Sequence, residues 1–401
     1  MIDTKLLTSV IILMTLSLVM SYSLSTYTVL HFHLDDFHFF LRQTVSVFIG
    51  IVLITILSKL DPDKWFNRIG FFLFFLFFFL MIAMQFMPTS MVKAVGGAKR
   101  WIHIGPASIA PVEFFKIGFV FFLSWSFSRK MLSPETLSLK EEFKMLLPYL
   151  VIFSLVVLLI AVFQKDLGQV VVLAGTLAIL FLVVGRSLKF FVIMISASLI
   201  SFIILILVAP HRVKRVLSWW STVQDTIISL IPFDAAQRLH IEAGREPYQI
   251  SNSLNAIYNG GFWGQGLGSG QFKLGYVSEV HTDFVLAGLS EELGFVGLLF
   301  VILIFIHIIF RLNKIAAQIL EPRYALFSIG MGLLIGLALI VNSFGISGMT
   351  PIKGIAVPFL SYGGSQIVAN CIAIGMVLMV SKKMIRLPQG NKQSINTREV
   401  L

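Results

Sequence analysis

Long apolar segments recur along this chain, separated by polar stretches that are mostly short. A helix needs roughly 17 to 25 apolar residues to cross the hydrocarbon layer of a bilayer. Ten segments meet that requirement: residues 5–27, 38–58, 70–88, 108–127, 145–164, 167–185, 189–209, 284–310, 324–346 and 358–381. The pattern predicts an all-α polytopic membrane domain of ten transmembrane helices over residues 1–386, followed by a cytoplasmic tail over residues 387–401.

Basic residues are unevenly shared between the polar loops, which orients the chain. With the N-terminus in the cytoplasm, the inner loops and both termini hold eighteen Lys and Arg residues, whereas the four short outer loops hold five. Because cytoplasmic loops carry the excess of Lys and Arg, we expect both termini in the cytoplasm. The net charge of +11 could suggest a nucleic-acid partner, but the placement of the basic residues indicates membrane topology instead. The single cysteine, Cys371, excludes an intrachain disulfide.

One outer segment, residues 210–283, is much longer than the others. Within it, apolar residues recur at helical spacing from Val213 to Leu230, with polar residues between them. This pattern is typical of an amphipathic helix lying on a membrane surface, and Trp219 and Trp220 would anchor it there. A linker helix with no function of its own is the alternative.

The end of this segment holds six glycines between Gly260 and Gly270, followed by Asp283 and a hydrophobic helix. Glycine permits positive φ angles and close backbone approach. A carboxylate at the start of a membrane segment is costly unless it is used. Asp283 is therefore the first candidate for a catalytic residue.

Other ionisable side chains fall within the predicted helices. Glu113 and Lys116 lie three residues apart, so they share a helix face and can neutralise each other. Arg42 needs an anionic or carbonyl partner. Glu291 and Glu292 are expected to face the interior of the bundle. All five are candidates for shaping a polar cavity, and purely structural pairing is the alternative.

The outer loops bring six charged side chains to one face of the membrane: Lys99, Arg100, Asp166, Lys273, Asp283 and Lys353. A glycosidase needs two carboxylates, because a sugar leaving group must be protonated as it departs. A transferase acting on a sugar diphosphate needs one base, plus cations that stabilise the departing phosphate. One carboxylate among several cations is the set of groups that such a transferase needs. A transporter, which also places charges in polar cavities, remains open.

Several motifs follow one another along the chain: Gly97-Ala-Lys-Arg-Trp101, Pro111-Val-Glu-Phe-Phe-Lys116, Gln164 with Asp166-Leu-Gly168, Glu279-Val-His-Thr-Asp-Phe284, Pro351-Ile-Lys-Gly354 and Pro358-Phe-Leu-Ser-Tyr-Gly-Gly-Ser365. In this order they resemble the SEDS family (shape, elongation, division and sporulation). The sequence from Tyr248 to Lys273 resembles that of the division-type members more closely than that of the elongation-type members. Four residues depart from the family pattern, which leaves the local loop shape open: Ala110, Val112, Lys165 and Ser278, the last two standing in place of proline.

The resemblance implies a peptidoglycan glycosyltransferase that polymerises lipid II at the outer face of the bacterial inner membrane, at the division septum. Asp283 would be the base that activates the acceptor hydroxyl, and the attack would invert the donor carbon and release undecaprenyl diphosphate. The residues expected to contact substrate are Lys99, Arg100, Asp166, Arg212, Arg215, Lys273, Glu279, His281, Lys353 and Ser361. Those expected to shape the cavity are Arg42, Glu113, Lys116, Glu291 and Glu292.

The implied partners are a class B penicillin-binding protein, which is a transpeptidase of the FtsI type, other divisome proteins and membrane lipids. The sequence shows no dedicated cage of metal ligands, although a Mg²⁺ or Mn²⁺ ion bridging Asp283 and a diphosphate would fit. Three alternatives stay open: a lipid II flippase, an elongation-type polymerase, and a divisome scaffold in which Asp283 is only structural.

Overall fold

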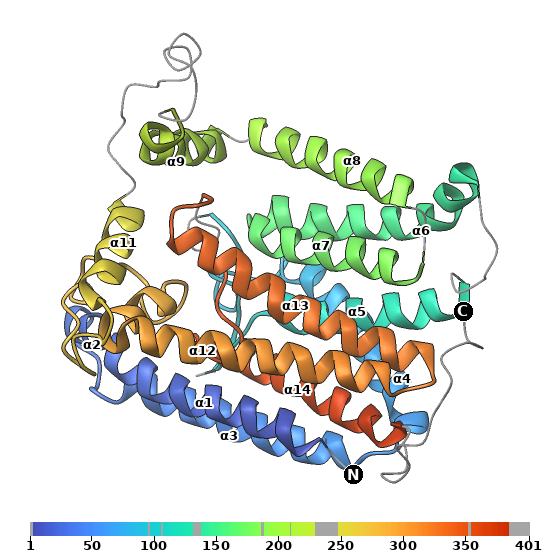
Figure 1. Ribbon diagram of the computed structural model, residues 1–401, viewed down its shortest axis with the longest axis horizontal. Helices are drawn as coiled ribbons and strands as arrows, with labels where there is room; N and C mark the ends of the chain where they lie inside the picture. Colours follow the sequence, from blue (N-terminus) through green and yellow to red (C-terminus); the bar gives the residue numbers. More distant parts are fainter. Residues whose placement is uncertain are drawn as a thin grey trace, which may run out of the picture.

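The computed structural model describes residues 3–94, 97–105, 107–130, 138–185, 188–208, 210–228, 248–351 and 354–384. Within them, long helices run side by side in a bundle (Figure 1). These helices are α1 (Thr4–Leu24), α3 (His38–Lys59), α4 (Pro62–Ala83), α5 (Pro111–Lys130), α6 (Leu139–Val157), α7 (Leu167–Val183), α8 (Leu188–Leu207), α12 (Val285–Ala317), α13 (Pro322–Ile346) and α14 (Gly364–Val380). Each of the ten segments predicted from hydropathy overlaps one of these helices.

Seven of the described helices are long and apolar enough to cross a membrane: α1, α3, α4, α6 with its π-helical extension η1 (Leu158–Phe163), α12, α13 and α14. Helix α7 is apolar but 17 residues long. The chain is therefore a multi-pass membrane protein. The count of ten spanning helices remains a prediction.

Further helices lie at one end of the bundle, namely α2 (Thr26–His31), α9 (Pro210–Ile228) and α11 (Tyr248–Gly260), whereas α1 begins at the opposite end (Figure 1). A small hairpin of β1 (Ile102–Ile104) and β2 (Ala107–Ile109) pairs Ile102 with Ile109. A 3₁₀ turn, η2 (Ser381–Lys383), follows α14. Helix α9 covers most of the predicted amphipathic segment, whereas α11 was not predicted.

Two helix boundaries differ from the hydropathy prediction. Helix α4 begins at Pro62 rather than residue 70, because Asp61 accepts a hydrogen bond from the backbone N–H of Asp63 and proline suits the first helical turn. Helix α14 begins at Gly364 rather than residue 358. Before it, Phe359 has a φ of +61°, which lies outside the right-handed helical region. The chain therefore enters α14 through an irregular polar segment.

Close helix contacts depend on glycines, which let backbones approach. A Cβ atom added at Gly118 of α5 would lie 2.4 Å from the backbone nitrogen of Phe74 in α4. A Cβ atom at Gly50 of α3 would lie 2.5 Å from the Cys371 sulfur in α14. The buried Cys371 thus fills the space against α3, as a small apolar side chain would.

Candidate active site

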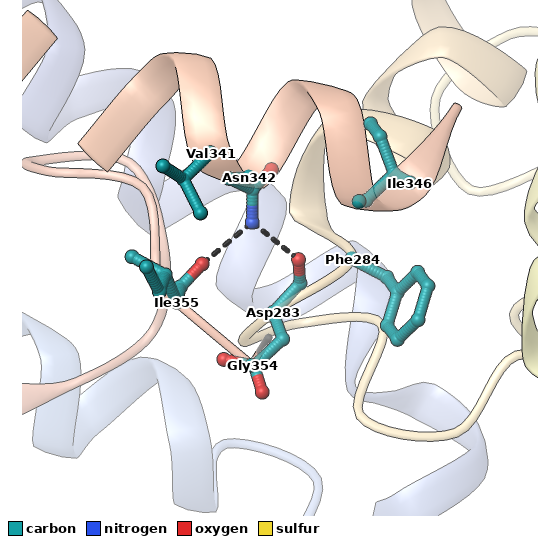
Figure 2. Close-up of a pocket in the computed structure, with 8 residues that line it drawn as sticks. Asp283, Phe284, Val341, Asn342, Ile346, Gly354 and Ile355 are labelled. Carbon is teal, nitrogen blue, oxygen red and sulfur yellow. Dashed lines mark hydrogen bonds between the residues drawn. The ribbon is translucent and has the colours of Figure 1, made fainter. Parts of the chain in front are cut away.

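Asp283 lies where three segments meet: the entry to α12, the last turn of α13, and the loop before α14. Asn342 of α13 donates two hydrogen bonds of 2.6 Å from its amide nitrogen, one to the carbonyl oxygen of Asp283 and one to that of Ile355. Figure 2 shows the amide between these two carbonyl groups. The side chain of one helix therefore holds two outer loops together beside the candidate base.

A small pocket opens at this junction, and its empty space of about 210 Å³ includes a part that is open to solvent. Its lining residues are Asp283, Phe284, Val341, Asn342, Gly345, Ile346, Gly354 and Ile355. Ligand pockets usually enclose roughly 300 to 1,000 Å³, so this space can be only one part of a site for a large substrate. A Cβ atom at Gly354 would lie 3.0 Å from Asp283 Oδ2, so a side chain there would crowd the carboxylate.

The carboxyl group of Asp283 is partly buried, and charged groups of its own loop and of other loops act on it. Burial, together with the negative charges of Asp166 and Glu279, raises its pKa to about 7, and the positive charge of Arg100 opposes this shift. A carboxylate of this kind holds a proton far more tightly than an ordinary aspartate and can act as a general base near neutral pH. The expectation of one carboxylate among cations is corrected: Asp283 lies within the electrostatic reach of two others.

Asp166 caps α7 by accepting a hydrogen bond of 3.2 Å from the backbone N–H of Gln169. Burial raises the pKa of Asp166, and Arg100 opposes that shift. Arg100 also holds the preceding turn in place, since its Nε donates to the Gln164 carbonyl at 2.8 Å and its Nη2 donates to the Lys165 carbonyl at 3.0 Å. In the structure the guanidinium therefore binds the turn that carries Asp166.

The backbone of Lys165 is left-handed, with a φ of +52°. Proline, which occupies this place in the family motif, is fixed near −65° and cannot adopt that angle. With proline at this position, the turn could not have the shape that it has here. In this turn the carbonyl group of Lys165 accepts the hydrogen bond from Arg100.

Glu113 and Lys116 form an ion pair of 2.8 Å. Each of them also forms a hydrogen bond with the side chain of Gln169. Lys116 donates to Gln169 Oε1 at 2.9 Å, and Gln169 Nε2 donates to Glu113 Oε1 at 3.0 Å. The three side chains close a ring between α5 and α7. Because Gln169 also donates its backbone N–H to Asp166, this ring adjoins the turn described above.

Glu291, fully buried, holds the glycine-rich loop. It accepts hydrogen bonds from the backbone N–H groups of Gln271 and Phe272, at 2.7 and 3.1 Å, and from the Asn259 amide at 3.0 Å. At Gly264 and Gly270, an added Cβ atom would collide with this part of α12. The glycines therefore allow the loop to pack directly on the first turns of α12.

Lys273 is also buried, and its Nζ lies 2.7 Å from Glu292 Oε1. Ser23 of α1 joins the pair, accepting from Lys273 at 3.1 Å and donating to Glu292 at 2.6 Å. Lys273 is not among the pocket-lining residues. Its predicted contact with substrate would require this buried pair to open.

Three more predicted substrate residues support the loop that carries Asp283. Ser361 donates to the Thr282 carbonyl at 2.6 Å and accepts from the Val357 N–H at 2.8 Å. His281 is buried against an aromatic neighbour, with a ring-centroid distance of 4.8 Å to Phe39, and burial lowers its pKa. Glu279 is exposed, has a φ of +55°, and accepts a hydrogen bond from the hydroxyl group of Thr282.

The remaining predicted residues are placed as follows. Lys99 donates to the Gln85 carbonyl at 2.8 Å, in the preceding outer turn. Arg42 is exposed on α3, and its positive charge acts on the Tyr362 hydroxyl. Lys353 lies outside the described residues, as do the side chains of Arg212 and Arg215 on α9. Within the described parts of the chain, no group of three His, Cys, Asp or Glu side chains is arranged to hold a metal ion.

Some buried amides of this region were not predicted, Asn342 and Gln43 among them. Asn342 joins the loops at Asp283, as described above. Gln43 of α3 donates to the Ser361 carbonyl at 3.2 Å and accepts from the Gly363 N–H at 3.2 Å. A polar amide inside an apolar helix was the available signal, because a buried amide needs hydrogen-bond partners.

Comparisons with known proteins agree with this picture. The sequence model of the FtsW/RodA/SpoVE family, described as cell cycle proteins, matches residues 3–385. A relative from Helicobacter pylori, named "Probable peptidoglycan glycosyltransferase FtsW", is 48% identical over 95% of this chain and 98% of its own length. The "Stage V sporulation protein E" of Bacillus subtilis is 31% identical over 95% of this chain and 97% of its own length.

Two solved structures share the fold. The rod shape determining protein RodA of Thermus thermophilus superposes with a TM-score of 0.61 at 20% identity, covering 96% of this chain and 98% of its own. A chain from the study "Structural coordination of polymerization and crosslinking by a peptidoglycan synthase complex" superposes with a TM-score of 0.68 at 21% identity, covering 95% and 98%.

Proposed function

The chain belongs to the FtsW/RodA/SpoVE family, and from that membership and the geometry around Asp283 we propose that it is a peptidoglycan glycosyltransferase that polymerises lipid II. The observation that carries the assignment of the base is the pocket at Asp283, where burial and neighbouring carboxylates raise the pKa of this group to about 7. The name of the Helicobacter pylori relative supports the reaction class.

The proposed reaction needs one proton acceptor. Asp283 takes the proton from the acceptor sugar hydroxyl as its oxygen attacks the anomeric carbon of the donor. The new glycosidic bond forms on the face opposite the breaking bond to phosphate, so the configuration at that carbon inverts. Undecaprenyl diphosphate leaves as an anion and needs no general acid. The pocket is smaller than a whole ligand site, which suits a place for the reacting hydroxyl rather than for the entire headgroup.

Cationic side chains would stabilise the departing diphosphate. Among the described residues, Arg100 is a candidate whose charge acts on Asp283, and its guanidinium can form bidentate contacts with phosphate oxygens. Lys99, Lys273, Arg212, Arg215 and Lys353 remain candidates from the sequence. A Mg²⁺ or Mn²⁺ ion, if present, would be held by Asp283 and diphosphate oxygens, since Mg²⁺ commonly binds one carboxylate together with substrate phosphates.

We further propose the topology and setting of the enzyme. Ten helices span the bacterial inner membrane with both termini in the cytoplasm, so that Asp283 and the segment 210–283 lie on the outer side, and the protein acts at the division septum. The partner is a class B penicillin-binding protein, which cross-links the new glycan, together with other divisome proteins. Support for the partner comes from the fold shared with a chain of a peptidoglycan synthase complex.

The test is polymerisation of lipid II by the purified full chain, with and without a class B penicillin-binding protein, for the wild type and Asp283→Asn. We expect glycan strands from the wild type and none above background from the variant, at equal thermal stability. Polymerisation by Asp283→Asn at the parental rate would contradict the mechanism. Vesicles that translocate lipid II without making glycan would instead indicate a flippase.

A further inference from the structure

Among the polar residues that the structure describes in the long helices, Asn342 combines three features. It lies in the last turn of α13 and is 5% exposed. Both hydrogen bonds from its amide nitrogen go to backbone carbonyls outside α13, those of Asp283 and Ile355. It also lines the pocket next to the carboxylate (Figure 2).

The orientation of this amide is dictated by its neighbours. Two carbonyl oxygens face the same amide atom, and only the NH₂ group can donate to both. The other amide atom, Oδ1, is buried without a hydrogen-bond partner among the described residues. Burying an unsatisfied oxygen is unfavourable, so packing alone gives no reason for an asparagine here. The two donated hydrogen bonds give that reason.

These bonds act on the position of the carboxylate. One fixes the backbone of Asp283 immediately before α12, and the other fixes Ile355, the neighbour of Gly354. Gly354 in turn lies against Asp283 Oδ2, where an added Cβ atom would be 3.0 Å away. The amide therefore sets the separation between the residue that carries the carboxylate and the loop that seats it.

We propose that Asn342 is a positioning residue for the reaction: its amide locks the Asp283 backbone to the loop at Ile355, so that the carboxylate is held against Gly354 in the pocket. The inference rests on the proposed function of Asp283. Asn342 does not touch the transferred atoms itself. Misplacement of a catalytic group by about 1 Å can cost on the order of 10²-fold in rate, so loss of the amide should reduce kcat strongly.

The test compares Asn342→Leu with Asn252→Leu in full-length protein, with lipid II as the probe and the class B penicillin-binding protein present. Leucine has nearly the shape of asparagine and suits a membrane helix. Asn252 is the matched control, because its amide nitrogen also donates to a loop carbonyl, that of Tyr276 at 2.9 Å, and it is 9% exposed but does not contact Asp283.

We expect Asn342→Leu to lower kcat on the order of 10²-fold with little change in KM, and Asn252→Leu to leave kcat near the wild-type value. The pH profile supplies a second readout. A carboxylate released into water, away from Asp166 and Glu279 and also from Arg100, regains an ordinary aspartate pKa, so the acid limb should move to lower pH. A fall in the amount of folded enzyme would not move that limb.

Each outcome decides the proposal. A folded Asn342→Leu variant with wild-type kcat and an unchanged acid limb would overturn it, while leaving the proposed function intact. If Asn342→Leu fails to fold, Asn342→Ser is assayed in its place, since its hydroxyl keeps one donor. Failure of both variants to fold would show that the amide supports the fold rather than the reaction. A wild type that makes no glycan would refute the proposed function instead.

Discussion

Lys273 and Glu292 form an ion pair in the interior, with 2.7 Å between Nζ and Oε1 and side-chain exposures of 3% and 0%. The lysine belongs to the glycine-rich loop, the glutamate to α12, and the serine that joins them to α1. The pair therefore fastens the loop that leads to Asp283 onto two helices of the bundle. Its geometry favours a structural role for Lys273 over a direct contact with diphosphate.

Replacing Lys273 by methionine should destabilise the protein strongly. The change leaves the Glu292 carboxylate buried without its partner, which typically costs about 3–5 kcal/mol. The matched control is Lys383→Met, because Lys383 pairs with Asp63 at the surface, where the side chains are 43% and 51% exposed, and such pairs contribute about 0–1 kcal/mol. Thermal unfolding in detergent measures both. Equal losses of stability in the two variants would contradict a structural role for the buried pair. Weaker lipid II binding by a fully stable Lys273→Met would instead support the predicted contact between Lys273 and substrate.

The sequence could predict the helices and the candidate base, because both follow from the cost of placing polar groups in a bilayer. Asp283 was found in this way. The sequence could not predict how Lys273 is used, since its partner is 19 residues away and the loop between them folds back on α12. The amide of Asn342 inside an apolar helix signalled a buried polar contact but not its partners, because these are backbone carbonyls of two loops and no residue type marks a carbonyl.

Helix α11 and the late start of α14 show a second limit. Hydropathy finds segments that must avoid water, but α11 lies among the polar elements at one end of the bundle. Before α14, the irregular backbone is stabilised by specific bonds, such as that between the Val357 N–H and the Ser361 hydroxyl. Such contacts depend on the folded arrangement and leave no periodic pattern in the sequence.

The activity should depend on pH through Asp283. The base works when deprotonated, and burial with nearby carboxylates raises its pKa to about 7, so kcat/KM should fall as the pH drops through about 7. Arg100 lowers this pKa and Glu279 raises it. Arg100→Gln should therefore move the acid limb to higher pH, and Glu279→Gln should move it to lower pH. Initial polymerisation rates across the pH range provide the measurement, and shifts of the same sign in both variants would be inconsistent with this account.

Replacing Lys165 by the proline of the family motif should destabilise the turn. Its φ of +52° is closed to proline, so Lys165→Pro must rearrange the turn and break the Arg100 contact to the residue 165 carbonyl. We expect reduced stability and reduced activity. Lys165→Gly is the control, because glycine adopts positive φ without strain and keeps the carbonyl. Thermal unfolding and polymerisation assays distinguish the two. A Lys165→Pro variant as stable and active as Lys165→Gly would show that this turn readily takes another shape.

A side chain at Gly354 should impair the reaction by crowding Asp283. Gly105 serves as a control, because it separates this effect from the backbone cost of alanine. Both Gly354 and Gly105 have positive φ angles, of +59° and +60°, so alanine at either position carries a similar backbone cost of about 1–2 kcal/mol. A Cβ atom at Gly105 meets nothing within 4 Å, whereas one at Gly354 lies 3.0 Å from Asp283 Oδ2. We expect similar losses of thermal stability in the two alanine variants, but a fall in kcat on the order of 10²-fold only for Gly354→Ala, because its methyl group displaces the base. Equal kcat values would mean that the carboxylate does not act from its place beside Gly354.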